Sequence, residues 1–265
     1  MIYNNYVIFV IYEGYNYKGF QIQKDFDTIQ ERILKALKET FSFFNFDIKI
    51  ISMSYTGRTD AKVSAIKQVV NFKTDKPIKI NKNIFLDKLN HFLPYDIRVY
   101  NFFPVDNNFN ARYEADFKFY IYKTISFLDS HFLKTYNNYS IYNILENEDY
   151  FKIQRDYIKN AYGFNNFIFL PDFDYIKKER ILKTITYFNT EKKFDSFYKP
   201  DKVYKNTYLK LEFNIDFYEF KEIQIIIFNF RSKYFLRNMV RKVVGTILAH
   251  AYNEIDIDYI RDMFD

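Results

Sequence analysis

The residues with the clearest chemical potential form a short loop, Thr56-Gly57-Arg58-Thr59-Asp60-Ala61. Arg58 and Asp60 lie two residues apart beside threonine hydroxyls, and Gly57 gives the backbone the freedom that a tight connection needs. Apolar segments flank the loop, so we expect it at the rim of a sheet, where catalytic side chains are common. A solvated Arg–Asp pair that closes a hairpin is the alternative, and the loop alone is compatible with both.

A second candidate is the basic and aromatic segment 109–113, which leads into residues 118–123. Its cations and rings are interleaved, which suits an RNA groove because cations meet phosphates and rings stack on unpaired bases. In a chain with 32 Phe and 26 Tyr, core packing produces the same pattern. The segment therefore indicates RNA binding only in combination with other features.

A third candidate is the segment 234–252, whose apolar residues follow helical spacing and predict a helix. On this helix Arg237 and Arg241 fall at the edge of the apolar face, near Val244 and Leu248. An arginine beside a buried stripe is partly desolvated and is stabilised by an anionic partner. Snorkelling of the side chain toward water is the alternative.

Strands and helices occur in blocks along the chain, which is typical of an α+β fold. Besides the helix 234–252, we expect a helix that begins at the capping box Thr28-Ile29-Gln30-Glu31. The other expected helices are 81–92, 150–162, 176–189 and 256–264, with a polar connection at 129–150. The expected strands are 7–12, 48–56, 66–72, 97–103, 117–127, 204–217 and 222–230.

The composition excludes several kinds of site. The 265 residues include no cysteine, which excludes disulfides and thiolate metal sites, and three separated histidines argue against a histidine-rich metal site. No apolar run approaches the roughly 20 residues that span a bilayer, so we expect a cytoplasmic protein. A net charge of +6 favours a polyanionic partner, although it serves solubility equally well.

Taken together, the motifs resemble those of the TruA family of tRNA pseudouridine synthases. The central match is Gly57-Arg58-Thr59-Asp60-Ala61, followed by Val63, Ala65 and Gln68-Val69-Val70-Asn71-Phe72. The other matching blocks are Gly19-Phe20-Gln21-Ile22-Gln23, Thr28-Ile29-Gln30-Glu31, Asn110-Ala111-Arg112-Tyr113, Tyr120-Ile121-Tyr122, Phe194-Asp195-Ser196-Phe197 and the run from Phe235 to Gly245. The blocks follow the family's order over nearly the whole chain, so the set is specific although single blocks are not.

The resemblance implies an α+β pseudouridine synthase fold, with a mixed, mainly antiparallel sheet flanked by helices and two related halves. Residues 1–105 would carry the catalytic loop, and residues 106–265 would complete the RNA cleft. It also implies a homodimer that modifies uridines 38 to 40 of the tRNA anticodon stem-loop without a metal or another cofactor. The alternatives are a catalytically silent tRNA-binding protein, a synthase with other RNA targets, and an interaction protein whose aromatic residues fill a core.

Matched position by position, the resemblance assigns Asp60 as the catalytic carboxylate and Arg241 as its counter-charge. Whether the carboxylate attacks the ribose, abstracts a proton or stabilises a glycosyl cation is left open. Tyr120 corresponds to a tyrosine beside the uracil, and Arg58 to a residue that meets the RNA and helps to extrude the base. The remaining expected RNA contacts are Arg112, Lys118, Leu236 and Arg237.

Two departures from the family pattern follow the aspartate. The family usually has Gly where Lys62 stands and His where Ser64 stands. Lys62 requires a negative φ or tolerates strain, so the path of the loop after Asp60 is open. Loss of the histidine removes a contact to RNA or substrate, but it leaves the carboxylate in place.

Overall fold

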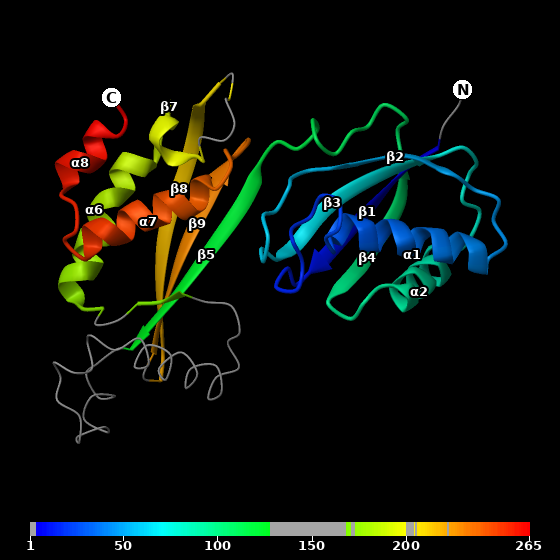
Figure 1. Ribbon diagram of the computed structural model, residues 1–265, viewed down its shortest axis with the longest axis horizontal. Coiled ribbons are helices and arrows are strands. Elements are labelled where there is room, and N and C mark those ends of the chain that lie inside the picture. Colours follow the sequence, from blue (N-terminus) through cyan, green and yellow to red (C-terminus); the bar gives the residue numbers. More distant parts are fainter. Residues whose placement is uncertain (1–3, 128–167, 171–172, 200–203, 205, 222) are drawn as a thin grey trace. The chain divides into compact units, whose positions relative to one another are not determined.

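The computed structural model describes residues 4–127, 168–170, 173–199, 204, 206–221 and 223–265 (Figure 1). They form two compact units, Met1–Asp116 and Phe117–Asp265. Each unit has a mainly antiparallel sheet with helices against one face, which confirms the expected α+β fold. The expected connection 129–150 and helix 150–162 lie outside the described residues. The functional division into halves 1–105 and 106–265 stays a prediction.

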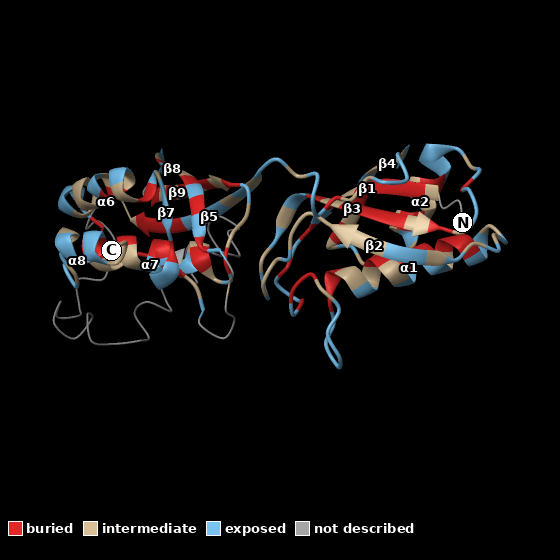
Figure 2. Cartoon of the chain, turned by 90° about the horizontal axis from the view of Figure 1, so that it is seen from above, coloured by how far each residue is buried: buried red, intermediate tan, exposed pale blue. Residues whose placement is uncertain are grey.

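Unit 1 is built on a four-stranded antiparallel sheet in the order β2-β3-β1-β4. Its elements are β1 (Asn4–Tyr12), α1 (Ile29–Phe43), β2 (Ile50–Tyr55), β3 (Ala65–Thr74), α2 (Lys82–Phe92) and β4 (Ile97–Val105). Strand alternation puts Ile8 and Val10 on the helical face, where they share a core with Ile33 and Leu37 of α1 (Figure 2). This layer supports the turns at the ends of the strands.

Helix α1 starts where the sequence predicts, but the expected capping box is wrong. Thr28 is the N-cap residue, yet its buried hydroxyl makes no hydrogen bond to the helix or to any other described atom. Instead, the Ile29 and Gln30 N–H groups donate to the carbonyls of Gly19 and Phe20, at 3.2 and 2.9 Å. These carbonyls satisfy donors that a helix start leaves unpaired, and they tie α1 to the preceding loop.

Unit 2 is built on a five-stranded sheet in the order β6-β5-β9-β8-β7, in which only the β5–β6 pair is parallel. Its strands are β5 (Lys118–Phe127), β6 (Ile168–Phe169), β7 (Thr190–Lys193), β8 (Tyr208–Phe220) and β9 (Ile223–Ser232). Its helices are α6 (Tyr175–Phe188), the 3₁₀ turn η1 (Asp195–Phe197), α7 (Met239–Ala251) and α8 (Ile257–Asp262). Phe228 and Phe230 of β9 share a core with Val243 and Ile247 of α7. Strand β8 begins at Tyr208 rather than at the expected residue 204.

Helix α7 is shorter than the expected helix 234–252, and Arg237 does not lie on it. Asn238, just before the helix, has a left-handed backbone with φ 58°, which interrupts a right-handed helix. The Arg237 N–H donates to the Tyr204 hydroxyl at 2.9 Å, and the Arg237 carbonyl accepts from the Lys199 N–H at 3.1 Å. These contacts hold Arg237 in an irregular segment, so of the two arginines only Arg241 is helical.

Candidate active site

Asp60 lies on a loop that its neighbours hold in place. The Thr59 hydroxyl is 2.9 Å from the Tyr12 hydroxyl, and the Thr59 carbonyl accepts from the Phe20 N–H at 3.1 Å. Asp60 is half-buried, and within the described part of unit 1 no hydrogen bond or ion pair engages its carboxylate. Arg58 is exposed and forms no ion pair with Asp60 there, which counts against the simple Arg–Asp surface pair. The Asp60 carboxylate is thus positioned through its backbone, and it has no described partner in unit 1.

The chain after Asp60 is held by the loop before α1. The Val63 N–H donates to the Asp60 carbonyl at 3.2 Å, which closes a turn, and the Lys62 N–H donates to the Tyr17 carbonyl at 3.2 Å. Ser64, at the position where the resemblance leads one to expect a histidine, accepts from the Gly14 N–H at 3.0 Å. The serine therefore has a structural role in the loop.

Two glycines permit this close approach of the loops. A Cβ atom on Gly14 would lie 2.0 Å from the Val63 carbonyl oxygen, a distance that no side chain tolerates. Gly19 has φ +111°, and a Cβ there would lie 2.9 Å from the Thr59 carbonyl oxygen. Both positions require glycine because backbone from the Asp60 loop occupies the space of a side chain.

The start of the Asp60 loop is fixed by Gln68 of β3. The Gln68 amide donates to the Gly57 carbonyl at 2.5 Å, and the Thr56 hydroxyl donates to the Gln68 amide oxygen at 3.3 Å. Gln68 is 6% exposed, so these hydrogen bonds are largely shielded from water. Gln68 thus positions Gly57 at the start of the Asp60 loop.

Tyr17 and Asp96 support the loop and were not singled out from the sequence. The Tyr17 hydroxyl donates to the Asp96 carboxylate at 2.6 Å, while the Tyr17 carbonyl holds Lys62. Burial, followed by the hydrogen bond and the negative charge of Asp96, raises the pKa of the Tyr17 phenol. The tyrosine therefore stays protonated and acts as a donor. No sequence signal identifies the pair, because its members are 79 positions apart.

The backbone at Lys62 defines the path of the loop after Asp60. It is left-handed, with φ 65°, so the loop follows a path that normally favours glycine. We expect Lys62→Gly to raise the free energy of unfolding by about 0.5 kcal/mol, because relief of left-handed strain exceeds the added entropy of the unfolded chain. Chemical denaturation measures the change.

The control for Lys62→Gly is Lys38→Gly, in the middle of α1 on its exposed side. There the same substitution should lower the free energy of unfolding by about 1 kcal/mol, because glycine is a poor helix former. A loss of stability of that size in both variants would show that the left-handed backbone at Lys62 carries no strain.

In unit 2 the expected site residues gather around β5 and α7. The Tyr120 ring meets Phe235 edge-on, with 4.8 Å between the ring centroids. Tyr122 lies two residues further along the same face of β5. Burial raises the pKa of the Tyr122 phenol, and the positive charge of Arg241 opposes that rise, so Arg241 lies within electrostatic range of the phenol. This face of β5 therefore combines two tyrosines with the Arg241 guanidinium.

The other expected contact residues differ in exposure. Leu236 is 3% exposed and packs in the core of unit 2. Arg112 and Arg237 are exposed, and Lys118 is half-buried at the start of β5. The structure thus places Arg58, Asp60 and Arg112 in unit 1, and the remaining expected residues in unit 2. The approach of Asp60 to Arg241 stays a prediction.

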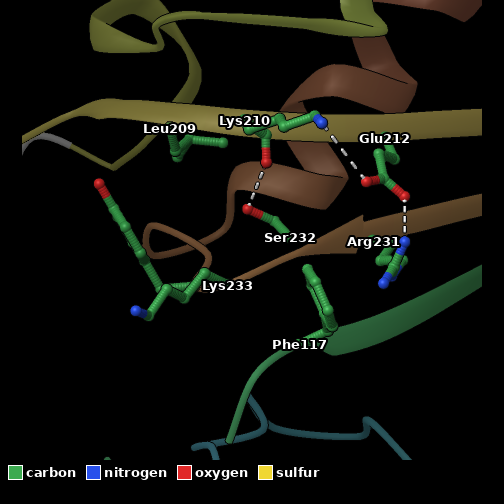
Figure 3. Close-up of a pocket in the computed structure, with 8 residues that line it drawn as sticks. Phe117, Leu209, Lys210, Glu212, Arg231, Ser232 and Lys233 are labelled. Carbon is green, nitrogen blue, oxygen red and sulfur yellow. Dashed lines mark hydrogen bonds and ion pairs between the residues drawn. The ribbon is translucent and has the colours of Figure 1, made fainter.

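A small hollow in unit 2 lies at the end of the sheet where β5 begins and β9 ends (Figure 3). The Arg231 guanidinium lies over the Phe117 ring, 3.6 Å from its centroid, and pairs with Glu212 at 2.6 Å. Lys210 also approaches Glu212, at 3.9 Å. The Glu212 carboxylate offsets part of this positive charge, and none of the expected site residues lines the hollow.

The described residues bring together no group of three His, Cys, Asp or Glu side chains suited to a metal ion. None of their helices has both the length and the apolar character required to cross a membrane.

An α+β chain with antiparallel sheets and a loop-held aspartate fits the class of pseudouridine synthases. No family model matches the chain. Curated relatives do: "tRNA pseudouridine synthase A" of Dictyoglomus thermophilum is 30% identical, covering 97% of this chain and 90% of the relative. The protein of the same name from Wigglesworthia glossinidia brevipalpis is 33% identical, covering 90% and 75%. The chain belongs to the tRNA pseudouridine synthase A family, whose members are isomerases that act on tRNA.

Among solved structures, an unknown protein from Galdieria sulphuraria covers 96% of this chain and 94% of its own, with 9% identity. Its TM-score of 0.23 is too low to support an argument about fold or function.

Proposed function

We propose that this protein converts uridine to pseudouridine at positions 38 to 40 of the tRNA anticodon stem-loop, with Asp60 as the catalytic carboxylate. Family membership supports the reaction and the tRNA substrate. The observation that carries the role of Asp60 is its position: the backbone on both sides is fixed by hydrogen bonds, while its carboxylate is unpaired in unit 1. A group held in this way is ready to meet a substrate without first breaking an ion pair.

The proposed reaction rearranges bonds and changes no oxidation state overall. The bond between N1 of uracil and C1′ of ribose breaks, the base turns, and a bond forms between C5 and C1′. The C5 proton leaves, and N1 gains a proton. An ionised carboxylate serves this sequence by attacking the ribose, by accepting the C5 proton, or by stabilising a glycosyl cation. The balance needs no oxidant or reductant.

The other site residues provide charge and stacking in this proposal. Arg241 supplies the counter-charge that keeps a desolvated carboxylate ionised. Tyr120 lies against the target uracil, and Arg58 contacts the RNA while the base is extruded, a step that costs a few kcal/mol. The remaining residues proposed to contact the RNA are Arg112, Lys118 and Arg237. Leu236 was expected among them, but it is buried in the core of unit 2 and is proposed only to support the wall of the site.

The proposal also covers the roles of the two halves of the chain, the oligomeric state and the location in the cell. Residues 1–105 supply the catalytic loop, residues 106–265 complete the RNA cleft, and two copies form a homodimer in the cytoplasm. The net charge of +6 supports binding of a polyanion, because cationic side chains release counterions from the phosphate backbone.

The proposed function is tested by mapping pseudouridine in unmodified tRNA transcripts after incubation with the protein. We expect pseudouridine only at positions 38 to 40, and none in a matched transcript whose uridines at those positions are cytidines. Pseudouridine elsewhere would assign a different target. Salt-sensitive tRNA binding without any pseudouridine would show that the protein is a silent tRNA-binding protein.

A further inference from the structure

A buried pair of asparagines lies on the face of the unit 1 sheet opposite its helices. Asn5 of β1 is 2% exposed and Asn71 of β3 is 3% exposed. The Asn71 amide nitrogen donates to the Asn5 amide oxygen at 3.0 Å. Asparagine is disfavoured in strands, and an unpaired buried amide is destabilising. Two such residues at neighbouring sheet positions therefore indicate specific partners.

The partners are backbone atoms of the chain segment that follows β4. The Asn5 amide nitrogen donates to the carbonyls of Asp106 and Phe109, both at 2.9 Å. The Ala111 N–H donates to the Asn71 amide oxygen at 2.9 Å, and Asn71 also donates to the Phe109 carbonyl at 3.4 Å. Every polar atom of the two amides is thereby engaged, and four of the five hydrogen bonds lead to residues 106–111.

These hydrogen bonds fix the backbone immediately before Arg112. Ala111 is 1% exposed, so the chain is pinned against the sheet at that residue. Ala111 lies in a turn that begins at Asn110. The Asn110 side chain accepts from the Arg112 N–H at 3.0 Å, and the Asn110 carbonyl accepts from the Tyr113 N–H at 3.0 Å. The Arg112 side chain projects from this turn and is exposed, with its guanidinium 5.6 Å from the Tyr113 ring centroid.

We propose that Asn5 and Asn71 are positioning residues that set the place of Arg112 for contact with tRNA. This inference rests on the proposed function, because it takes Arg112 to be an RNA contact. A long flexible side chain binds a phosphate best when its backbone is already ordered, since ordering during binding costs free energy. The asparagine pair provides that order from inside the fold, without touching the RNA.

The test compares the dissociation constant for tRNA in four proteins: wild type, Asn71→Ala, Arg112→Ala and the double variant. We expect Asn71→Ala to weaken binding by about tenfold, and hydrogen exchange at the Ala111 amide to rise. In the Arg112→Ala background, Asn71→Ala should have no further effect on binding, because the residue that it positions is gone. At saturating tRNA, the turnover rate of Asn71→Ala should differ from that of the wild type by less than twofold.

The matched control is Thr74→Val, on the same strand. Thr74 is fully buried, and its hydroxyl donates to the Lys76 carbonyl at 2.8 Å. We expect this variant to lower the free energy of unfolding without changing the affinity for tRNA. If Asn71→Ala does not fold, Asn5→Ala replaces it in the same cycle. Equal weakening in both Arg112 backgrounds, or unchanged binding despite faster exchange at Ala111, would overturn the inference. Because the readout is binding, absence of pseudouridine in the wild type would instead count against the proposed function.

Discussion

Asp60→Asn should abolish pseudouridine formation while folding and tRNA affinity stay nearly unchanged. The amide has almost the shape of the carboxylate, but it carries no negative charge and is a poor nucleophile and base. In unit 1 the Asp60 carboxylate makes no hydrogen bond or ion pair, so its replacement removes no described contact of that unit. Release of label from C5-tritiated uridine in tRNA measures turnover, and thermal unfolding measures stability.

The matched control for Asp60→Asn is Asp87→Asn, which makes the same change of charge at an exposed position on α2. It should retain the wild-type rate. Turnover by Asp60→Asn at more than a trace of that rate would defeat the assignment of the catalytic carboxylate. A loss of folding in this variant would instead show that Asp60 has a structural role that its contacts do not reveal.

Arg241→Ala is expected to lower the rate of pseudouridine formation by about 200- to 5,000-fold. In the proposed complex, RNA covers Asp60 and Arg241 and desolvates both. Removal of one member of a desolvated ion pair costs about 3–5 kcal/mol, because the remaining charge is left uncompensated. The loss should appear mainly in kcat, since the counter-charge acts on the carboxylate during reaction. Arg241→Lys should recover only part of the rate, because an ammonium group does not reproduce the planar guanidinium.

Lys242→Ala is the control for Arg241→Ala. It removes the same charge from the next residue of α7, which is also exposed in unit 2. We expect it to weaken tRNA binding slightly, with kcat unchanged. A wild-type kcat for Arg241→Ala would identify Arg241 as a solvated residue of the helix, and equal losses in the two variants would indicate a general effect of charge on tRNA binding.

Apolar periodicity was sufficient to predict most elements, because β1, β4, α1 and α2 of unit 1 bury apolar residues at regular spacing. It failed at residues 234–238, where apolar spacing continues but Asn238 turns left-handed and tertiary hydrogen bonds hold Arg237. The capping box failed for a related reason: the Gly19 and Phe20 carbonyls pair with the first two N–H groups of α1, and the Thr28 hydroxyl makes no capping hydrogen bond. In each case a partner distant in sequence overrides a local preference.

The scarcity of glycine was informative at some positions only. The chain has only five glycines, and Gly14 and Gly19 are required by the close approach of the Asp60 loop. Gly245 is different, because an added Cβ would meet nothing within 4 Å in the described structure. Glycine is therefore sterically required at positions 14 and 19, whereas the described structure shows no such requirement at position 245.

The asparagine pair and the Tyr17–Asp96 contact could not be predicted from the sequence. The asparagines lie 38 to 104 positions from their partners in the segment after β4. These partners are backbone atoms, which carry no residue-specific signal. The motifs did place Asp60 on a loop between two strands, and this was confirmed. What the residues of unit 1 and unit 2 do together stays a prediction.

The left-handed lysine after Asp60 bears on how homologous sequences are compared. Contacts from Tyr17, Phe20 and Gly14 impose the course of this loop from outside, so its shape does not depend on a permissive residue at position 62. A missing glycine in an otherwise intact motif is therefore poor grounds for classifying a homologue as a pseudoenzyme.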